Sequence, residues 1–283
     1  MASPPTDIVI ACCRDEADII GSFISFYVDQ GFDAICLVDN GSRDDTVREI
    51  KRHPARDRIR LHCDPRVGYD GRLMEYNRLF SPLASRWIFF LDVDEFIVIP
   101  GGIKTYAEQL PLDCSILEMA TFEMIPDTAT VAPEPLLAVR RESQLTEERK
   151  VVWKVGIPQL IYCGKHAIGS DQAKPYQDPA LYIRHFHTRS ARQFRSKLQN
   201  RVETEATLSS SAEFRDVLSF FDSTERREWL EESRGFLEAD GWTREKERLA
   251  EIPWVEDTEI RDWYRRRGSA PQILMAADRP GGS

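Results

Sequence analysis

Two periodicities alternate along the first hundred residues and predict a sheet of mainly parallel strands. Short apolar runs typical of buried strands are separated by segments in which apolar residues recur every three or four positions, as they do in helices. Such alternation is typical of right-handed βαβ units. The predicted strands cover residues 7–13, 34–38, 59–62 and 87–91, and the predicted helices lie between Asp15 and Gly31, before Arg52 and over residues 73–83.

The pattern changes in the second half of the chain. Residues 115–183 contain further strand-like pieces and proline-bounded loops, whereas the segment after Ser190 is helical in pattern and highly charged. Residues 269–283 contain proline and glycine and are expected to fray. We therefore predict an α/β protein with one domain over residues 1–200 and a helical C-terminal extension over residues 201–283.

The strand at residues 87–91 leads directly into two carboxylates, Asp92 and Asp94. Open α/β sheets bind their ligands at the carboxyl ends of strands, which is where these aspartates fall. In an extended chain Asp92 and Asp94 would point the same way, and their oxygens would suit Mg²⁺ or Mn²⁺ bound together with substrate phosphates. A metal-bound diphosphate is the first hypothesis, and a solvated turn after a core strand is the alternative.

A second polar group follows the predicted strand at residues 34–38. Asp39 precedes an Asn-Gly pair, a strong turn former, so one interpretation is an ordinary βα turn. The other is that Asp39 accepts hydrogen bonds from a nucleobase or a ribose. Because the strands are predicted to be parallel, Asp39 and Asp92 should lie at one edge of the sheet, and Arg14 and Glu16 should face the same edge.

Composition narrows the possible classes of function. The 283 residues are enough for one large α/β domain with an appendage, and a hydrophobic content of 42% is ordinary for a globular protein. The formal net charge of -9 argues against a nucleic-acid partner, because nucleic-acid binders are normally basic. An acidic protein that binds phosphates needs local positive charge or a metal, and the aspartate pair would supply the metal.

Neither a secretory nor a membrane-spanning segment is predicted. The N-terminus lacks a basic region, and no apolar stretch approaches the roughly 20 residues of a membrane span, so any membrane contact is expected to be peripheral. The six cysteines include no CxxC pair, and Cys12, Cys36 and Cys114 sit in apolar strand-like runs. These features favour a cytoplasmic protein and indicate neither a zinc site nor a disulfide framework.

Several motifs in a fixed order resemble a family 2-type glycosyltransferase, of the bacterial branch related to family 92. That branch carries RNE, DNGS-x-D and DxDEF, and the matching segments here are Arg14-Asp15-Glu16, Asp39-Asn40-Gly41-Ser42 and Asp92-Val93-Asp94-Glu95-Phe96. A later segment resembles the branch's HY-x-x-KS element, with Phe186 and Arg189 replacing Tyr and Lys. Lys154 and His166 fall where the branch often has a basic residue and a histidine. The resemblance covers roughly residues 7–200.

This resemblance implies a GT-A fold, with a Rossmann-like αβα nucleotide-binding half followed by a mixed-sheet acceptor half. It implies transfer of a sugar, with inversion, from a nucleotide-diphosphate donor, a UDP-sugar being favoured, to a hydroxyl of a saccharide or lipid-linked acceptor. The implied cofactor is a divalent metal, Mn²⁺ or Mg²⁺, since a metal stabilises the charge of a departing nucleoside diphosphate. The implied donor-binding residues are Arg14, Glu16, Asp39, Arg72 and Asp92, and the implied metal-binding residues are Asp92, Asp94 and His185.

The catalytic base is predicted among the carboxylates that follow the strand at residues 115–122. Inverting transfer needs one carboxylate to take the proton of the acceptor hydroxyl. Glu123 is favoured over Asp127, and the alternative is that both are ordinary loop charges. By alternation His185 and His187 share one face; a functional role is favoured for His185, against packed or surface histidines.

Two other classes of function compete with glycosyl transfer. A haloacid-dehalogenase-like phosphatase also ends an apolar run with DxD and uses the first Asp as a nucleophile. That family has its DxD on the first strand, with Thr or Val where this chain has Phe96. A catalytically inactive sugar-nucleotide-fold binding or scaffold protein is the second, against which Asp39, Asp92, Asp94 and His185 argue. Turnover of a sugar nucleotide would separate the three.

The extension carries apolar residues at helical spacing, including Leu230, Phe236 and Leu237. One stripe of each helix is therefore expected to be buried. The plain interpretation is a helical appendage packed on the catalytic domain. The alternative is a surface that presents an acceptor, a partner subunit or a membrane.

Overall fold

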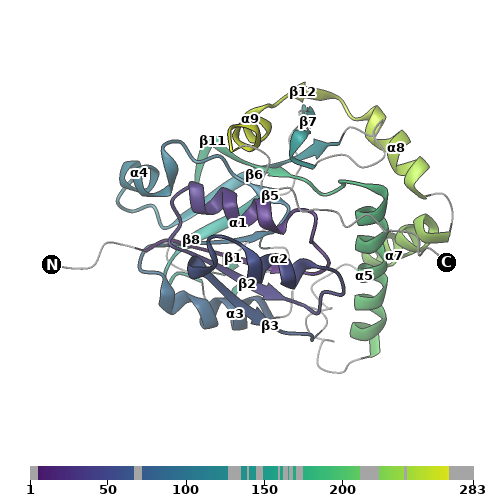
Figure 1. The fold of residues 1–283 in the computed structure, drawn as a ribbon, viewed down its shortest axis with the longest axis horizontal. Helices are drawn as coiled ribbons and strands as arrows, with labels where there is room; N and C mark the ends of the chain where they lie inside the picture. The colour runs from purple at the N-terminus through teal and green to yellow at the C-terminus, as the bar shows by residue number, and fades with distance from the viewer. Residues whose placement is uncertain are drawn as a thin grey trace, which may run out of the picture.

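A large mixed sheet lies between helices in the computed structural model (Figure 1). Within the described residues, no helix is both long enough and apolar enough to cross a membrane. The structure describes residues 6–66, 72–126, 135–138, 140–144, 149–158, 160–161, 165, 168–169, 175–210, 223–238 and 241–267.

The first half of the sheet consists of parallel strands in the order β4-β1-β2-β3, with helices in the connections. This arrangement confirms the predicted βαβ alternation. The strands are β1 (Ile8–Cys13), β2 (Ala34–Asp39), β3 (Ile59–Cys63) and β4 (Trp87–Asp92), and the connecting helices are α1 (Ile20–Asp29), α2 (Thr46–Arg52) and α3 (Leu73–Phe80). Helix α4 (Gly102–Gln109) follows this half of the sheet.

Apolar clusters cover both faces of this parallel half. On one face Phe23 and Tyr27 of α1 pack in a cluster with Leu37 of β2. On the other face Leu73 and Tyr76 of α3 join a second cluster. Because the central strands are buried on both sides, their sequences are continuous apolar runs and not alternating patterns.

The second half of the sheet is mixed. The two halves join where β8 pairs antiparallel with β4 and with β6, and β11 then runs parallel to β6 and antiparallel to β5. A parallel half followed by a mixed half confirms the α/β architecture that was expected of a GT-A fold. The strands are β5 (Glu95–Phe96), β6 (Ile116–Ile125), β7 (Arg140–Glu142), β8 (Arg149–Lys154) and β11 (Tyr176–His185), and β9 (Leu160–Ile161) with β10 (Ile168–Gly169) forms a separate pair.

The C-terminal region packs against this core. Ile260 is 1% exposed within the first apolar cluster, and the ring of Trp263 packs edge-on against Phe26 at 4.9 Å between centroids. The extension packs on the domain, and β12 pairs with β7 in the main sheet. The division of the chain at residue 200 stays a prediction. The elements are α5 (Ala191–Ser210), α7 (Ser223–Glu238), α8 (Gly241–Glu251), β12 (Trp254–Glu256) and α9 (Glu259–Arg266).

Two predicted helix ends differ from the structure. Asp15 does not cap α1; it has a φ of 58°, and its carboxylate accepts hydrogen bonds from the backbone N–H groups of Arg43 and Asp44 at 2.6 and 3.2 Å. The helix predicted over residues 73–83 ends at Phe80, followed by a short 3₁₀ turn. Pro82 explains this end, because proline has no backbone N–H to continue the helix.

Candidate active site

The carboxyl ends of β1, β2 and β4 meet at one edge of the sheet, as predicted. In the parallel register Cys13 lies opposite Asp39, and Cys12 lies opposite Asp92. The two aspartates therefore end the strands on either side of β1. This edge is where open α/β sheets bind ligands.

Asp39 contributes to the turn after β2. Its side chain is buried, and its carboxylate accepts hydrogen bonds from the backbone N–H groups of Gly41 and Ser42, each at 3.3 Å. These contacts are longer than the usual range for N–H···O bonds and hold the carboxylate only weakly. The turn interpretation describes these contacts, and a role for Asp39 at a nucleoside stays a prediction.

Helix α5 packs along this edge of the sheet (Figure 1). Glu203 of α5 accepts from Arg14 at 2.8 Å and from Arg43 at 2.9 Å, and Asn200 donates to Asp15 at 2.9 Å. Exposed ion pairs of this kind each contribute less than about 1 kcal/mol, but together they fix the position of the helix. The guanidinium of Arg14 therefore binds α5 in this structure.

Glu16 lies deeper and contacts the guanidinium of Arg189. Arg189 is 1% exposed and also binds the carboxylate of Asp18, with Nε at 2.8 Å. Burial raises the pKa of Glu16 to about 7, even though Arg189 opposes this shift. Glu16 thus belongs to a buried ion-pair network at the carboxyl end of β1, and its predicted role at the nucleoside remains untested.

Asp92 is held by two buried lysines. Its Oδ2 lies 2.6 Å from Nζ of Lys150, and its Oδ1 contacts Nζ of Lys165. Glu95 accepts from the backbone N–H of Asp92 at 2.8 Å and lies 2.6 Å from Nζ of Lys150. Burial alone would raise the pKa of Asp92, but the charges of Lys150 and Lys165 outweigh it and lower that pKa. Asp92 is therefore a fixed, ionised acceptor.

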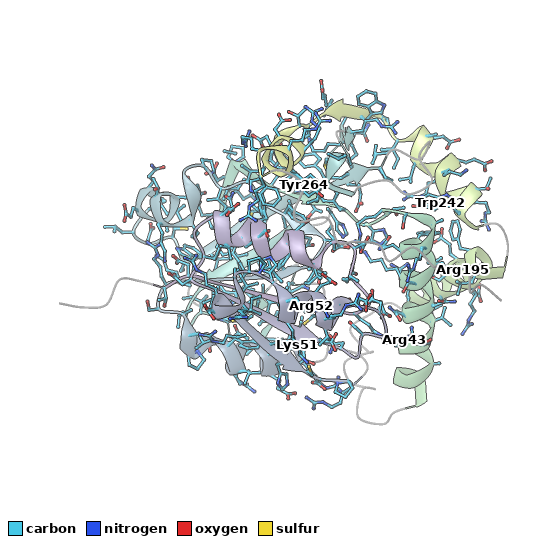
Figure 2. The ribbon with its side chains drawn as sticks, viewed as in Figure 1. Arg43, Lys51, Arg52, Arg195, Trp242 and Tyr264 are labelled. Atoms are coloured by element: carbon cyan, nitrogen blue, oxygen red, sulfur yellow. The ribbon has the colours of Figure 1, made fainter. Side chains whose placement is uncertain are left out.

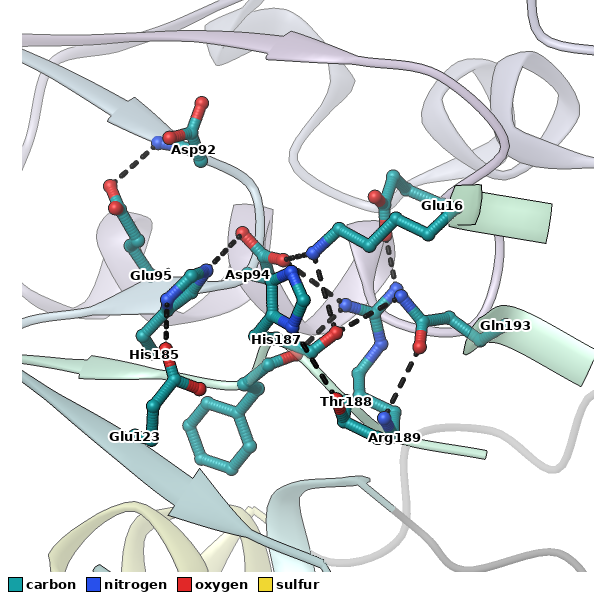
Figure 3. A network of polar contacts seen from close by, with 12 residues as sticks. Glu16, Asp92, Asp94, Glu95, Glu123, His185, His187, Thr188, Arg189 and Gln193 are labelled. Atoms are coloured by element: carbon teal, nitrogen blue, oxygen red, sulfur yellow. Dashed lines mark hydrogen bonds and ion pairs between the residues drawn. The ribbon is translucent and has the colours of Figure 1, made fainter. Parts of the chain in front are cut away.

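Asp94 faces a different set of cations (Figure 3). Its carboxylate lies 2.5 Å from Nζ of Lys197, 3.4 Å from Nη1 of Arg189 and 3.5 Å from Nε2 of His185. The expectation that Asp92 and Asp94 point the same way is wrong, because extended geometry stops at Asp92 and a turn follows. Burial would raise the pKa of Asp94, but Lys197 and His185 hold it well below its ordinary value.

His185 links Asp94 to Glu123. Its Nδ1 lies 2.8 Å from Oε1 of Glu123, which stands opposite it in the β11–β6 pair. Burial lowers the pKa of His185, but the charges of Glu123 and Asp94 outweigh it and raise that pKa well above its ordinary value. The predicted base, Glu123, therefore contacts the imidazole, and the other ring nitrogen of His185 faces Asp94 (Figure 3). The predicted role of His185 at a metal stays a prediction.

Asp94 offers a carboxylate, and His185 in its neutral form would offer an imidazole nitrogen, to a divalent ion that takes its other ligands from a substrate. Among the described residues no group of three or more His, Cys, Asp or Glu side chains is arranged as a metal cage. Mg²⁺ needs no such cage, because it is usually bound through one or two carboxylates, water and substrate phosphates. Ligating histidines commonly have a carboxylate on their second nitrogen, which Glu123 supplies here. Asp92, bound by lysines, does not share this position.

His187 stands beside His185, with 5.3 Å between the ring centroids. Its Nδ1 lies 3.4 Å from Oγ1 of Thr188, which donates to Glu245 of α8 at 2.9 Å. The positive charge of Lys197, together with burial, lowers the pKa of His187 well below its ordinary value. This chain of contacts connects the C-terminal helices to the site.

Arg72 is a further predicted donor-binding residue that the structure describes. Arg72 precedes α3, is buried, and donates from Nη1 to the carbonyl of Arg66 at 3.5 Å. Its predicted contact with a diphosphate is not tested by this geometry. Asp127, the second candidate base, and His166 lie outside the described residues.

Sequence reasoning missed several cations of the site. Lys150 gave little signal, because it stands next to Arg149 at the start of β8, before the apolar residues of that strand. Lys197 gave no signal, since it is one of many charges on α5. Its neighbour in space, Asp94, is 103 positions away in the chain.

Comparison with known proteins adds a general likeness and no family. No protein-family description matched the chain, and no curated protein matched it. Two solved structures have a partly similar chain trace. One is TarS residues 1–349 from S. aureus in complex with UDP. The other is glucosyl-3-phosphoglycerate synthase from Mycobacterium tuberculosis with Mn²⁺, UDP and glucosyl-3-phosphoglycerate. TarS is 12% identical with a TM-score of 0.38, over 80% of this chain and 69% of that chain. The synthase is 14% identical with a TM-score of 0.37, over 77% and 82%.

Proposed function

We propose that this protein is a metal-dependent glycosyltransferase that uses a nucleotide-sugar donor, with a UDP-sugar favoured. The observation that carries the proposal is the meeting of Asp94 and His185 at the edge where Asp39 and Asp92 end their strands. The order of the DNGS-type and DxDEF segments along the chain also supports a nucleotide-sugar glycosyltransferase. Such an edge suits a ligand with one anionic and one nucleoside end.

In the proposed reaction the bond between the sugar C1 and the β-phosphate oxygen breaks, and its electron pair goes to that oxygen. The acceptor hydroxyl oxygen forms the new bond to C1, and its proton goes to a carboxylate base. Asp39 would accept from the nucleoside, and Asp92, held ionised by its lysines, would accept from a hydroxyl of the donor. The acceptor is proposed to be a saccharide or a lipid-linked molecule.

Asp94 and His185 would hold the divalent ion, whose chemistry when bound is to neutralise charge on the departing diphosphate. Glu123 would fix the imidazole of His185 in the orientation for this contact. For the predicted inverting transfer, Glu123 is also the candidate for the base that takes the proton of the acceptor hydroxyl. We further propose a cytoplasmic location, from the cysteine usage of the chain.

A thermal-shift screen of nucleoside diphosphates, with and without Mn²⁺, tests this proposal. A ligand that binds only the folded protein raises the melting temperature by mass action. We expect UDP with Mn²⁺ to give the largest shift, followed by turnover of a UDP-sugar. A protein that no nucleoside diphosphate stabilises, with or without the metal, would contradict the proposal.

Replacing Asp39 by alanine tests the nucleoside site. The donor affinity is expected to fall by about 1–3 kcal/mol, the range for leaving a buried hydrogen-bond partner unpaired. Calorimetry with UDP measures this loss, and Asp45→Ala, at an exposed position of the same loop, is the matched control. Unchanged UDP affinity in Asp39→Ala would leave Asp39 as a turn residue only.

Replacing Glu123 by glutamine separates its two possible roles. If Glu123 positions His185, we expect Mn²⁺ affinity to weaken by roughly 10- to 100-fold, with activity recovered at high Mn²⁺. If Glu123 is the base, the loss of kcat should persist at every Mn²⁺ concentration, by roughly 10²–10⁴-fold. Activity measured across a Mn²⁺ titration distinguishes these results, and wild-type behaviour throughout would exclude both roles.

A further inference from the structure

Asp94 is surrounded by more positive charge than one carboxylate needs. Its oxygens lie within 3.5 Å of a lysine, an arginine and a histidine: Lys197, Arg189 and His185. The side chain of Asp94 is only 4% exposed, so solvent does not screen these charges. Three cations therefore meet at one buried carboxylate, and each needs a counter-charge of its own to remain buried.

Two of these cations have carboxylate partners of their own. The imidazole of His185 binds Glu123, and the guanidinium of Arg189 binds Glu16. Lys197 differs: among the described residues, Asp94 is the one carboxylate that its ammonium contacts. If the carboxylate of Asp94 turns to a divalent ion, the charge of Lys197 is the one left without a counter-charge.

The position of Lys197 suits a second anion. Its Nζ also donates to the backbone carbonyl of His187 at 3.3 Å, and Gln193, one turn earlier on α5, donates to the same oxygen at 3.2 Å. The carbonyl can keep the ammonium at the site while its contact with Asp94 changes. The side chain of Lys197 is 25% exposed, so it extends from the buried carboxylate to the solvent from which a donor would arrive.

We propose that Lys197 binds the diphosphate of the donor and stabilises the departing nucleoside diphosphate, an inference that rests on the proposed glycosyl transfer. As the C1–O bond breaks, the electron pair passes to the β-phosphate oxygen, whose growing negative charge the ammonium offsets. No proton leaves Lys197 in this step; the proton of the acceptor hydroxyl goes to the base. A lysine acts here as a point charge, as it does in other phosphate sites.

The test compares a diphosphate with its nucleoside by calorimetry. UDP, GDP, ADP and TDP are first titrated into the wild-type protein in EDTA and in Mn²⁺, and the tightest binder and its nucleoside are then titrated into Lys197→Met. We expect Lys197→Met to weaken the diphosphate by roughly 10- to 100-fold, the range for a hydrogen bond to a charged group. Affinity for the nucleoside should stay unchanged, and Lys197→Arg should recover most of the diphosphate affinity.

Arg195→Met is the matched control. Arg195 lies two residues away on α5 (Figure 2), is exposed, and lines a hollow with Phe236 and Trp242 of the C-terminal helices. The diphosphate affinity of Arg195→Met should equal that of the wild-type protein. Equal diphosphate affinity in Lys197→Met and wild type would overturn the inference, as would equal losses for diphosphate and nucleoside, which indicate a structural defect. A wild-type protein that binds no diphosphate would overturn the proposed function itself.

Discussion

Replacing Asp94 by asparagine is expected to abolish the Mn²⁺-dependent stabilisation by UDP and to lower turnover of a UDP-sugar by roughly 10²–10³-fold or more. The carboxylate is buried among Lys197, Arg189 and His185, and asparagine keeps its shape but removes its charge. Loss of one preorganised charge-stabilising group costs this much in well-studied active sites. Thermal shift with and without Mn²⁺, together with turnover at saturating donor, measures both effects.

The control for this variant is Asp113→Asn, which removes an aspartate charge at an exposed position after α4. Circular dichroism should show that Asp94→Asn remains folded, although three cations near an uncharged amide will lower its stability. Asp94→Asn with wild-type metal-dependent turnover would rule out the assigned metal position. A loss of turnover without loss of the Mn²⁺-dependent stabilisation would indicate that the ion binds at another position.

Replacing Asp257 by asparagine should lower the free energy of unfolding by about 3–5 kcal/mol, the cost of breaking a buried ion pair by removing one partner. Asp257 is 4% exposed, and its carboxylate accepts from Nε of Arg184 at 2.9 Å and from the hydroxyl of Tyr182 at 2.9 Å. Arg184 is itself 1% exposed. The substitution would leave this buried guanidinium with only the exposed carboxylate of Glu259.

Urea unfolding measures the effect, and Glu256→Gln is the control. Glu256 is the adjacent residue and is exposed, so its substitution should change stability by less than about 0.5 kcal/mol. Equal stability of the two variants would mean that the segment after α8 is only loosely attached. The expected result would instead show that the segment between α8 and α9 contributes to the stability of the fold.

The extent to which the fold was predictable follows from the range of the interactions involved. Runs of apolar residues located the strands of the parallel half, and apolar residues every three or four positions located helix α1. Both signals could be detected because they depend only on residues close together in the sequence. The strand ends follow from the same signals, so the meeting of Asp39 and Asp92 at one edge could be deduced from the order of the residues alone. Local rules failed at Asp15, whose carboxylate binds a loop 28 residues later and not its own helix.

The sequence by itself therefore determined the order of the elements, the edge of the sheet that carries polar residues, and the carboxylates at that edge. Only the tertiary structure decided which charges meet there. Lys150 and Lys197 reach Asp92 and Asp94 across 58 and 103 positions, and Asp257 reaches Arg184 across 73. Such pairs produce no periodic pattern in the sequence. A charged residue on an amphipathic helix or in a strand gives the same sequence pattern whether its side chain faces solvent or a buried partner. Their selection depends on packing of the whole chain, where an unpaired buried charge is too costly to remain.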